Sequence, residues 1–182
     1  VILWTRVVPG AKQHQLLPVE WQVAKDREFN QVVAQGQTQS SAERDYTVKV
    51  DATGLKPNSQ YFYRFTVDGR HSAIGRTRTL PVGDVASFRI GLASCSTYPQ
   101  GYSNAYRHMA QSDIDLVLHL GDYIYEYKGG NSIGRQHLPF HELLTLDDYR
   151  QRYAQYRGDP DLQEAHRQHP FITVWDDHET AN

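Results

Sequence analysis

The first 80 residues alternate between apolar and polar side chains, which is the pattern of half-buried β-strands. The alternation is plain in Val19–Val23 and Tyr46–Val50, and the opening run Val1–Arg6 is also strand-like. Residues 61–67 place four large apolar side chains on one face and polar ones on the other. Short strands at this spacing predict a β-sandwich over residues 1–80.

A turn separates two of these strands and carries a short motif. The stretch Gly54-Leu55-Lys56-Pro57-x-x-x-Tyr61 has Gly and Pro in punctuating positions. It resembles the Leu-x-Pro…Tyr corner of fibronectin type III domains. The resemblance implies a fibronectin-III-like, N-terminally incomplete sandwich in which Tyr61 packs on its own turn and the domain serves as scaffold.

The pattern changes after a linker at residues 81–87. In 88–182, apolar runs at 88–93, 116–120 and 171–175 predict strands, and residues 104–111 and 145–156 have helical periodicity. Thr145 followed by Asp148 predicts a capping box. Strand–helix–strand order favours parallel pairing. The fold class we expect is therefore α+β with two domains, the second being α/β in character.

Each of the three predicted strands in the second domain runs into residues that can bind a metal. Cys95 follows the first, Asp122 and Tyr125 follow the second, and the third leads into Asp177 and His178. The carboxyl ends of strands form the edge where ligands sit in open α/β sheets. A thiol, two carboxylates, a phenol and an imidazole at one edge predict a shared metal site and an enzyme.

The individual residues keep alternatives at this point. Asp122 has two oxygens and is able to bridge two cations, but an Asp here also suits a cap on the next segment. Tyr125 would ligate as a phenolate only beside a strongly acidic cation such as Fe³⁺, because its usual pKa is near 10; packing is the commoner role. Cys95 is either a thiolate ligand, an inert buried residue or a nucleophile.

The last motif, Asp177-His178-Glu179, offers an oxygen ligand, an imidazole near the reacting group, and a carboxylate to orient that imidazole. Asn182 would add a neutral oxygen ligand. The alternative without a functional role is that Asp177-His178-Glu179 forms an acidic surface turn. His119, inside a predicted strand, is interpreted as a hydrogen-bonded core residue.

Bulk properties exclude several other classes. The chain has 182 residues, 39% hydrophobic and 22% charged, and its 19 basic and 21 acidic residues give a formal charge of -2, so no nucleic-acid-binding patch is expected. No apolar run approaches the roughly 20 residues of a transmembrane segment. Walker, Gly-x-Ser-x-Gly and zinc-ribbon motifs are absent. The chain begins without Met in a strand-like run, and we expect a segment of a longer protein.

Taken together, these motifs resemble the PhoD-type alkaline phosphatases, a branch of the metallophosphoesterases related to purple acid phosphatases. The resemblance spans nearly the whole chain and is most specific in three blocks, Leu118–Glu126, Tyr149–Arg157 and Trp175–Glu179. Ser94-Cys95-Ser96, Val1–Val7 and Gly75–Thr79 also match. The resemblance implies the first half of a metallophosphoesterase αββα sandwich after a fibronectin-like domain.

The resemblance also implies a site with Fe³⁺ and Ca²⁺. By position, Asp122 would bridge the metals, Cys95 and Tyr125 would bind iron, and Asp177 or Asn182 would contact the second metal. His178 would donate to the phosphate or the leaving oxygen. A metal-bound hydroxide would attack small phosphomonoesters or phosphodiesters. Because superfamily sites are completed by further His ligands, we expect this segment alone to bind metal weakly and to be inactive.

Two other functions compete with this interpretation. One is an extracellular binding or adhesion module with a degenerate phosphatase domain, which the intact candidate ligands argue against. The other is a phospholipase-type phosphodiesterase, which an apolar rim on the 128–141 loop would favour; that loop is interpreted as a lid, a substrate loop or simply a loop. The family resemblance implies a periplasmic or secreted location. The oligomeric state is left open.

Overall fold

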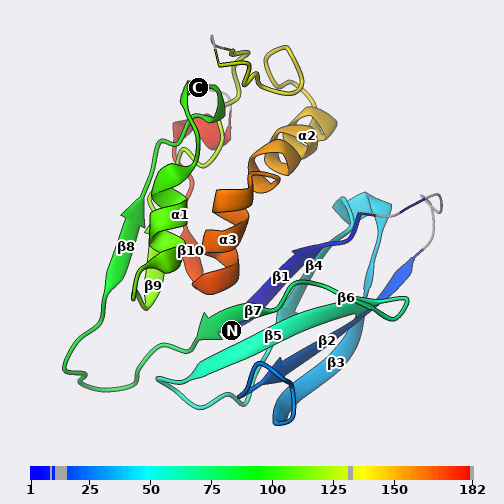
Figure 1. Cartoon of the computed structure of the whole chain (residues 1–182). Coiled ribbons are helices and arrows are strands. Elements are labelled where there is room, and N and C mark those ends of the chain that lie inside the picture. Colours follow the sequence, from blue (N-terminus) through cyan, green and yellow to red (C-terminus); the bar gives the residue numbers. More distant parts are fainter. Residues whose placement is uncertain (9, 11–15, 131–132, 181–182) are drawn as a thin grey trace. The chain divides into compact units, whose positions relative to one another are not determined.

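Strands and one short 3₁₀ turn make up the first half of the chain, and the second half alternates strands with helices (Figure 1). The computed structural model describes residues 1–8, 10, 16–130 and 133–180. The chain divides into two units, unit 1 from Val1 to Val85 and unit 2 from Ala86 to Asn182. Each unit has its own cluster of buried hydrophobic residues.

Unit 1 contains two antiparallel sheets. In the first, β1 (Ile2–Arg6) pairs with β4 (Thr47–Asp51). The second has the order β3-β2-β5-β6, with β7 also paired to β5. Its strands are β2 (Leu17–Ala24), β3 (Val32–Ser40), β5 (Gln60–Val67), β6 (Arg70–His71) and β7 (Gly75–Arg78). The strands predicted near residues 1–6, 19–23, 46–50 and 61–67 are all present.

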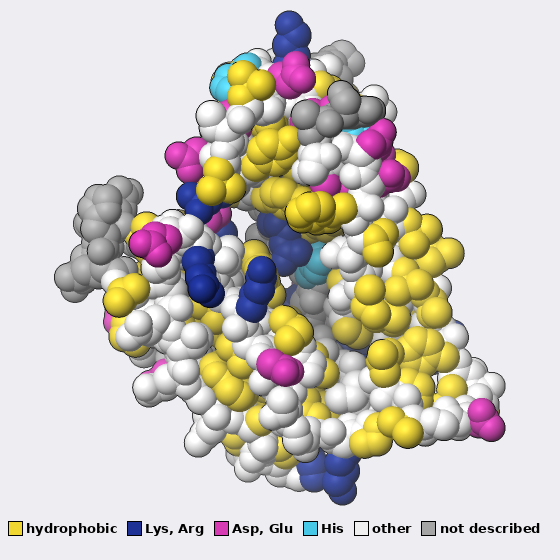
Figure 2. Space-filling view, turned by 180° about the vertical axis from the view of Figure 1, so that it is seen from behind, with side chains coloured by type: hydrophobic (Ala, Val, Ile, Leu, Met, Phe, Trp, Pro, Cys, Tyr) yellow, Lys and Arg dark blue, Asp and Glu magenta, His cyan; other side chains and the backbone are white. Residues whose placement is uncertain are grey.

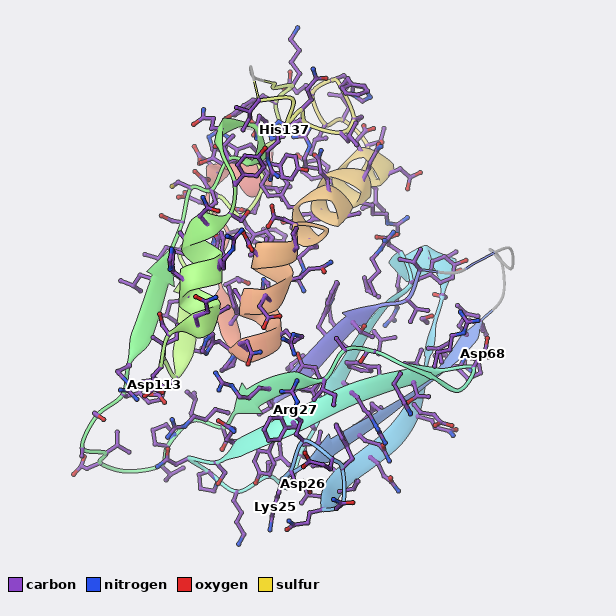
Figure 3. All side chains as sticks on the ribbon, in the orientation of Figure 1. Lys25, Asp26, Arg27, Asp68, Asp113 and His137 are labelled. Atoms are coloured by element: carbon purple, nitrogen blue, oxygen red, sulfur yellow. The ribbon has the colours of Figure 1, made fainter. Side chains whose placement is uncertain are left out.

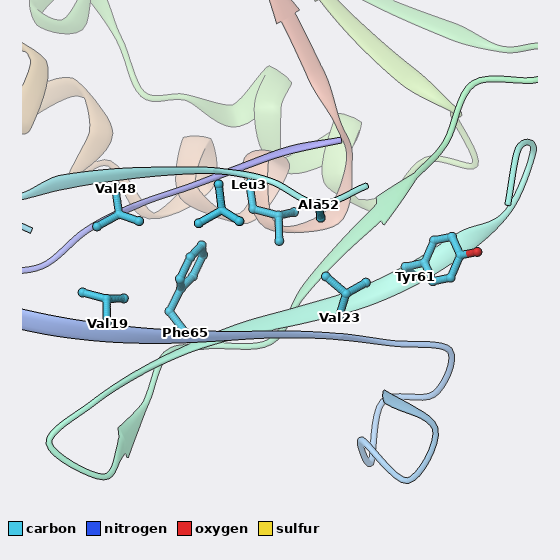
Figure 4. Close-up of a cluster of buried hydrophobic side chains, with 8 residues drawn as sticks. Leu3, Val19, Val23, Val48, Ala52, Tyr61 and Phe65 are labelled. Carbon is cyan, nitrogen blue, oxygen red and sulfur yellow. The ribbon is translucent and has the colours of Figure 1, made fainter. Parts of the chain in front are cut away.

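The core of unit 1 lies between these two sheets (Figure 4). Leu3 and Val48 point inward from β1 and β4, and Val19, Val23 and Phe65 point inward from β2 and β5. All five are at most 4% exposed. Alternation with period two therefore sends one side-chain set of each sheet into a shared apolar layer, as in a sandwich. Fully burying each such side chain stabilises the fold by about 1.5–3 kcal/mol.

Two local features of unit 1 bear on the sequence analysis. The phenol oxygen of Tyr61 accepts the backbone N–H of Lys56 at 3.0 Å, which confirms that this Tyr packs on its own turn. The strand β3 escaped prediction because its side chains are mostly Gln, Thr and Ser and only Ser40 is buried. Gly36 in β3 lies under Trp21, where a Cβ would come within 2.9 Å of the ring.

Unit 2 is built on a parallel sheet with the order β10-β9-β8. The strands are β8 (Ile90–Ala93), β9 (Leu116–His119) and β10 (Phe171–Thr173). The helices are α1 (Asn104–Gln111), between β8 and β9, and α2 (Leu146–Arg157) and α3 (Pro160–Gln168), between β9 and β10. None of the described helices is long and apolar enough to cross a membrane.

Both predicted helices are confirmed, as is the capping box of α2. The Thr145 hydroxyl accepts the N–H of Asp148 at 3.2 Å, and the Asp148 carboxylate accepts the N–H of Thr145 at 2.8 Å. The helix α3 was not predicted, because only Leu162 and Ala165 mark its buried face. Its start is nevertheless signalled by Asp159, whose carboxylate accepts two backbone N–H groups of the first turn.

Candidate metal centre

The carboxyl ends of β8, β9 and β10 lie side by side, because the three strands are parallel neighbours. Beyond β8, the backbone N–H of Cys95 donates to the carbonyl of Gly121 at 3.3 Å. On the other side, the N–H of Val174 donates to the carbonyl of His119 at 3.1 Å. Backbone hydrogen bonds therefore hold the segments that carry the candidate ligands next to one another at one edge of the sheet.

Three side chains converge at this edge. Asp122, Asp177 and His178 each offer one potential ligand atom, and these atoms lie within 4.8 Å of one another. Asp122 is buried, His178 is half-buried and Asp177 is exposed, so the group opens toward solvent on one side. Two carboxylates and an imidazole form a donor set that suits divalent and trivalent cations.

Asp122 has an uncommon backbone conformation, and one of its two carboxylate oxygens has no hydrogen-bond partner among the described residues. Its backbone has a φ of 51°, in the left-handed region that residues other than Gly adopt uncommonly and that Asp and Asn tolerate best. The side chain is 7% exposed, and its Oδ1 has no hydrogen-bond partner among the described residues. A buried carboxylate oxygen without a partner is expensive. The unmet oxygen therefore fits a cation ligand better than a helix cap.

Glu179 holds Asp122 in this conformation through the backbone. Its buried carboxylate accepts the N–H of Asp122 at 3.1 Å, the N–H of Ile124 at 3.4 Å, and the N–H of Tyr123. It also accepts the N–H of Asp176 at 2.7 Å. Successive amides that point at one anion form a nest, and the charge of Glu179 fills it. The carboxylate thus ties the segment after β9 to the segment after β10.

Gly121 makes this close approach possible. It has a φ of 105°, and a Cβ at this position would lie 2.9 Å from the backbone nitrogen of Asp176 and would collide with the Asp176 side chain. A larger residue would push the two strand-end segments apart. Gly121 is therefore required by the geometry that places Asp122 beside Asp177.

The imidazole of His178 is oriented by Glu126, which corrects one expectation. We expected Glu179 to orient His178, but Glu179 is occupied by the backbone amides. Instead, Nδ1 of His178 lies 2.7 Å from a carboxylate oxygen of Glu126, whose side chain is 7% exposed. Burial lowers the pKa of His178, but the hydrogen bond and charge of Glu126 outweigh it, so the pKa is raised overall. Nε2 is the nitrogen left for other partners.

Sequence reasoning missed Glu126, although a signal for it existed. It lies four residues after Asp122, as the one charged side chain in the aromatic run Tyr123–Tyr127. A carboxylate inside such a run is buried only when it is paired. The separation of 52 residues between Glu126 and His178 hid which group would pair with it.

Tyr125 lies against the candidate ligands. Its hydroxyl donates to Oδ2 of Asp122 at 3.2 Å, and its ring centroid lies 4.5 Å from that of His178. Burial raises the pKa of Tyr125 above its usual range, and the charge of Asp122 adds to the shift. The phenol is therefore protonated in the absence of a cation, and ligation by Tyr125 requires a cation acidic enough to displace that proton.

Two described candidates, Cys95 and His119, lie outside the three-residue group. Cys95 lies at the same edge, is exposed and has a φ of 55°, but it is not a member of the three-residue group. Asn182 lies outside the described residues. His119 is 1% exposed and its Nε2 bonds to the hydroxyl of Tyr106 at 3.0 Å, which confirms it as a hydrogen-bonded core residue.

Comparisons with known proteins match both halves of the chain. The family model of the PhoD-like phosphatases matches residues 90–182, and that of the PhoD-like phosphatase N-terminal domain matches residues 1–81. Alkaline phosphatase D of Bacillus subtilis (strain 168) is 42% identical over 193 residues, covering 100% of this chain and 33% of that protein. A solved structure of PhoD is 43% identical with a TM-score of 0.94, covering 100% of this chain and 37% of that one. The chain thus spans about a third of the length of these relatives.

Proposed function

Because this chain belongs to the PhoD-like phosphatase family, we propose that it forms part of a metal-dependent hydrolase of phosphomonoesters, phosphodiesters or both. The observation that carries the proposal is the convergence of Asp122, Asp177 and His178 at the strand ends, with one oxygen of Asp122 buried and unpaired. If Asp122 had only a structural role, both of its buried oxygens would be expected to accept hydrogen bonds or to pair with a cationic side chain.

The residues present fit a site for two metal ions. Asp122 would bridge the ions, with Oδ1 free and Oδ2 now held by Tyr125. Tyr125 and Cys95 would bind the more acidic ion, for which we favour Fe³⁺, and Asp177 would contact the other, for which we favour Ca²⁺. Bound ions of this kind polarise the phosphoryl oxygens and neutralise the charge that develops there. Asn182 is the alternative oxygen ligand for this second ion.

His178 would donate a proton or a hydrogen bond to the phosphate or to the leaving oxygen. Glu126 engages Nδ1, which turns Nε2 away from the carboxylate and holds the ring in one orientation. The raised pKa keeps the ring protonated to a higher pH than a free His would be. A fixed donor at a developing negative charge needs no reorganisation when the reaction occurs.

One face of the sheet in unit 2 exposes apolar side chains, which suggests that the rest of the polypeptide packs against it. Six apolar side chains on β8, β10 and the strand ends are between 46% and 76% exposed, namely Ile90, Leu92, Leu120, Ile172, Val174 and Trp175. Figure 2 shows hydrophobic side chains gathered over this part of the molecule. Parallel sheets are normally covered on both faces. We infer that the complete polypeptide covers this face, adds metal ligands, and is needed for activity.

The test is hydrolysis of a chromogenic phosphodiester and a chromogenic phosphomonoester by the complete parent polypeptide, loaded with Fe³⁺ and Ca²⁺. Wild type is compared with Asp122→Asn, which keeps the shape but removes the charge. The matched control is Asp113→Asn. Asp113 is exposed and pairs with Arg89 at 2.5 Å, and it lies at the opposite end of unit 2 from His137 (Figure 3).

We expect wild type and Asp113→Asn to turn over substrate and Asp122→Asn to lose turnover. The 182-residue segment, assayed beside the parent, should show none. A parent protein with no turnover toward either ester would reject the hydrolase and favour an extracellular binding or adhesion module with a degenerate phosphatase domain. Equal rates for wild type and Asp122→Asn would reject the metal-bridging role.

A phospholipase is a second candidate, because the described part of the 128–141 loop exposes apolar side chains. Ile133 is 45% exposed and Phe140 is 68% exposed, whereas Leu138 is half-buried. Exposed apolar groups beside a phosphodiester site would suit a lipid substrate. Hydrolysis of phospholipid in micelles much faster than of a soluble diester would favour this candidate. A periplasmic or secreted location remains a proposal from the family alone.

A further inference from the structure

The helix α2 carries a motif, Tyr149–Arg157, that the proposed chemistry does not use. Its buried face is unusual, because Arg152 is 0% exposed and Tyr156, one turn later, is 3% exposed. An Arg is almost never fully buried unless its charge is satisfied. The buried guanidinium is therefore expected to bind several hydrogen-bond acceptors.

Arg152 donates hydrogen bonds to backbone carbonyls from two separate segments. Its Nε donates to the carbonyl of Leu138 at 2.9 Å, and one terminal nitrogen donates to the carbonyl of Pro139 at 3.2 Å. The other terminal nitrogen donates to the carbonyls of Tyr125 and, at 3.2 Å, Tyr127. The planar fork of a guanidinium is suited to bridging several fixed acceptors at once.

One of these segments is the one that supplies the site. Tyr125 points its phenol at Asp122, and Glu126, between the two held carbonyls, points its carboxylate at His178. Carbonyls at positions 125 and 127 that bind one guanidinium leave little freedom for the backbone between them. Burial lowers the pKa of Arg152, and the negative charge of Glu126 acts against that shift.

The neighbours of Arg152 on α2 hold the adjoining backbone in the same way. The Tyr156 hydroxyl receives the N–H of Tyr98, three residues beyond Cys95, at 3.0 Å and bonds to Nε2 of the buried His137 at 2.9 Å. The Gln155 side chain receives the N–H of Leu138 at 2.9 Å. The helix is thus a support behind the strand-end segments.

We propose that Arg152 is a positioning residue of the metal centre: by binding the backbone on both sides of Glu126, it aims the Tyr125 phenol and the Glu126 carboxylate into the site. The inference rests on the proposed function, in that Tyr125 is taken as an iron ligand. Replacing the guanidinium by an ammonium keeps the charge but removes the fork, so one nitrogen cannot serve all four carbonyls.

The experiment titrates the metal-free parent polypeptide with Fe³⁺ supplied as its citrate complex and follows the visible absorption that a phenolate bound to Fe³⁺ produces. Wild type is compared with Arg152→Lys and Arg152→Gln. The control is Arg150→Lys on the same helix, where Arg150 pairs at 3.2 Å with the exposed Asp147. Circular dichroism and melting of the metal-free proteins identify any variant that fails to fold.

We expect folded Arg152→Lys to bind Fe³⁺ about 10–100-fold more weakly than wild type, with a matching fall in kcat and little change in KM, as for other residues that orient ligands. Arg150→Lys should behave as wild type. A lower melting temperature with unchanged Fe³⁺ affinity would make Arg152 merely structural and overturn the inference.

Two other outcomes separate the inference from the proposed function. A wild type that shows no visible band on binding Fe³⁺ would overturn the inference, because Tyr125 would then not be a ligand, even if the protein hydrolyses phosphoesters. A wild type that binds Fe³⁺ with the band but hydrolyses no phosphoester would reject the proposed function. In that case the affinities of the Arg152 variants would still decide the positioning role.

Discussion

The two units of this chain differ in what they bury. In unit 1, the buried polar side chains among the described residues are Ser40 and Thr77, and the rest of the core is apolar or aromatic. In unit 2, the buried polar and charged side chains are Asp115, His119, Asp122, Glu126, His137, Arg152, Asp159, His169 and Glu179. The core of unit 1 is therefore almost wholly apolar, whereas unit 2 combines an apolar cluster with many buried polar and charged side chains, Asp122, Glu126 and Glu179 at the candidate site among them.

The difference shows how stability and chemistry are divided within one chain. Burying a polar or charged group costs free energy unless hydrogen bonds and opposite charges replace the lost water. In unit 2 the replacement is made by long-range pairs such as Glu126 with His178 and Arg152 with the backbone near Tyr125. Those pairs add no apolar burial, but they hold the side chains of the candidate site in one orientation.

The largest effect we expect comes from the apolar core of unit 1. Phe65 is 4% exposed between the two sheets, and Phe65→Ala should destabilise unit 1 by about 3–5 kcal/mol through lost burial and a cavity. Hydrogen exchange followed by peptide in the parent protein would locate the loss. Because every described site residue lies in unit 2, kcat per folded molecule should not change; a fall in kcat would break the division of roles.

The next effect concerns His178 and separates a donor from a ligand. His178→Ala should lower kcat by about 10²–10³-fold, because a fixed donor to a developing charge is worth about 2.7–4 kcal/mol. Ca²⁺ affinity, measured by calorimetry, should stay close to wild type, whereas Asp122→Asn should weaken it. Loss of Ca²⁺ affinity in His178→Ala would instead make the imidazole a ligand, and a drop in kcat below about fivefold would remove the donor role.

Acid should distinguish the two units. Burial lowers the pKa of His137 to about 4, against 6.5 for an ordinary His, and the pKa of the half-buried His166 is lowered as well. The unfolded chain then binds more protons below about pH 6.5, so unit 2 should lose stability as the pH falls from there to about 4, on the order of 3 kcal/mol from His137 alone.

Hydrogen exchange at pH 7 and at pH 4.5 would test this on both units together. Unit 1 has no buried His among its described residues and should keep its protection. His137→Gln should reduce the acid sensitivity of unit 2. Parallel loss of protection in both units, or no change in His137→Gln, would contradict the assignment.

The smallest effect we expect is at Glu179, the carboxylate in the amide nest. Glu179→Gln keeps the volume but presents an amide N–H₂ to backbone donors, so the Asp122 segment should loosen and metal affinity in the parent protein should fall about 10–100-fold. Glu164→Gln, on the surface of α3 beside Arg167, serves as the control. Unchanged metal affinity in Glu179→Gln would show that the nest is not needed to present Asp122.

Much of the fold was predictable because local patterns of apolar and polar residues indicate its strands and helices. Period-two alternation predicted β1, β2, β4 and β5, and helical periodicity with a capping box predicted α2. The strand β3 and the helix α3 were missed because polar side chains dominate them, so the periodic signal was weak. Their positions come from pairing with β2 and from packing against α1, which no short window of sequence contains.

The candidate site was likewise predictable in part, where local sequence patterns indicated it. The sequence by itself determined that Asp122, Tyr125, Asp177 and His178 follow apolar strands, and parallel pairing then brings strand ends to one edge. Only the tertiary structure decided the partners: Glu126 rather than Glu179 for the imidazole, backbone amides for Glu179, and carbonyls for Arg152. Glu179 and Asp122 are 57 residues apart. A hydrogen bond forms only when packing sets the donor–acceptor distance between two segments to within a few tenths of an ångström, and residue spacing along the chain does not encode that distance.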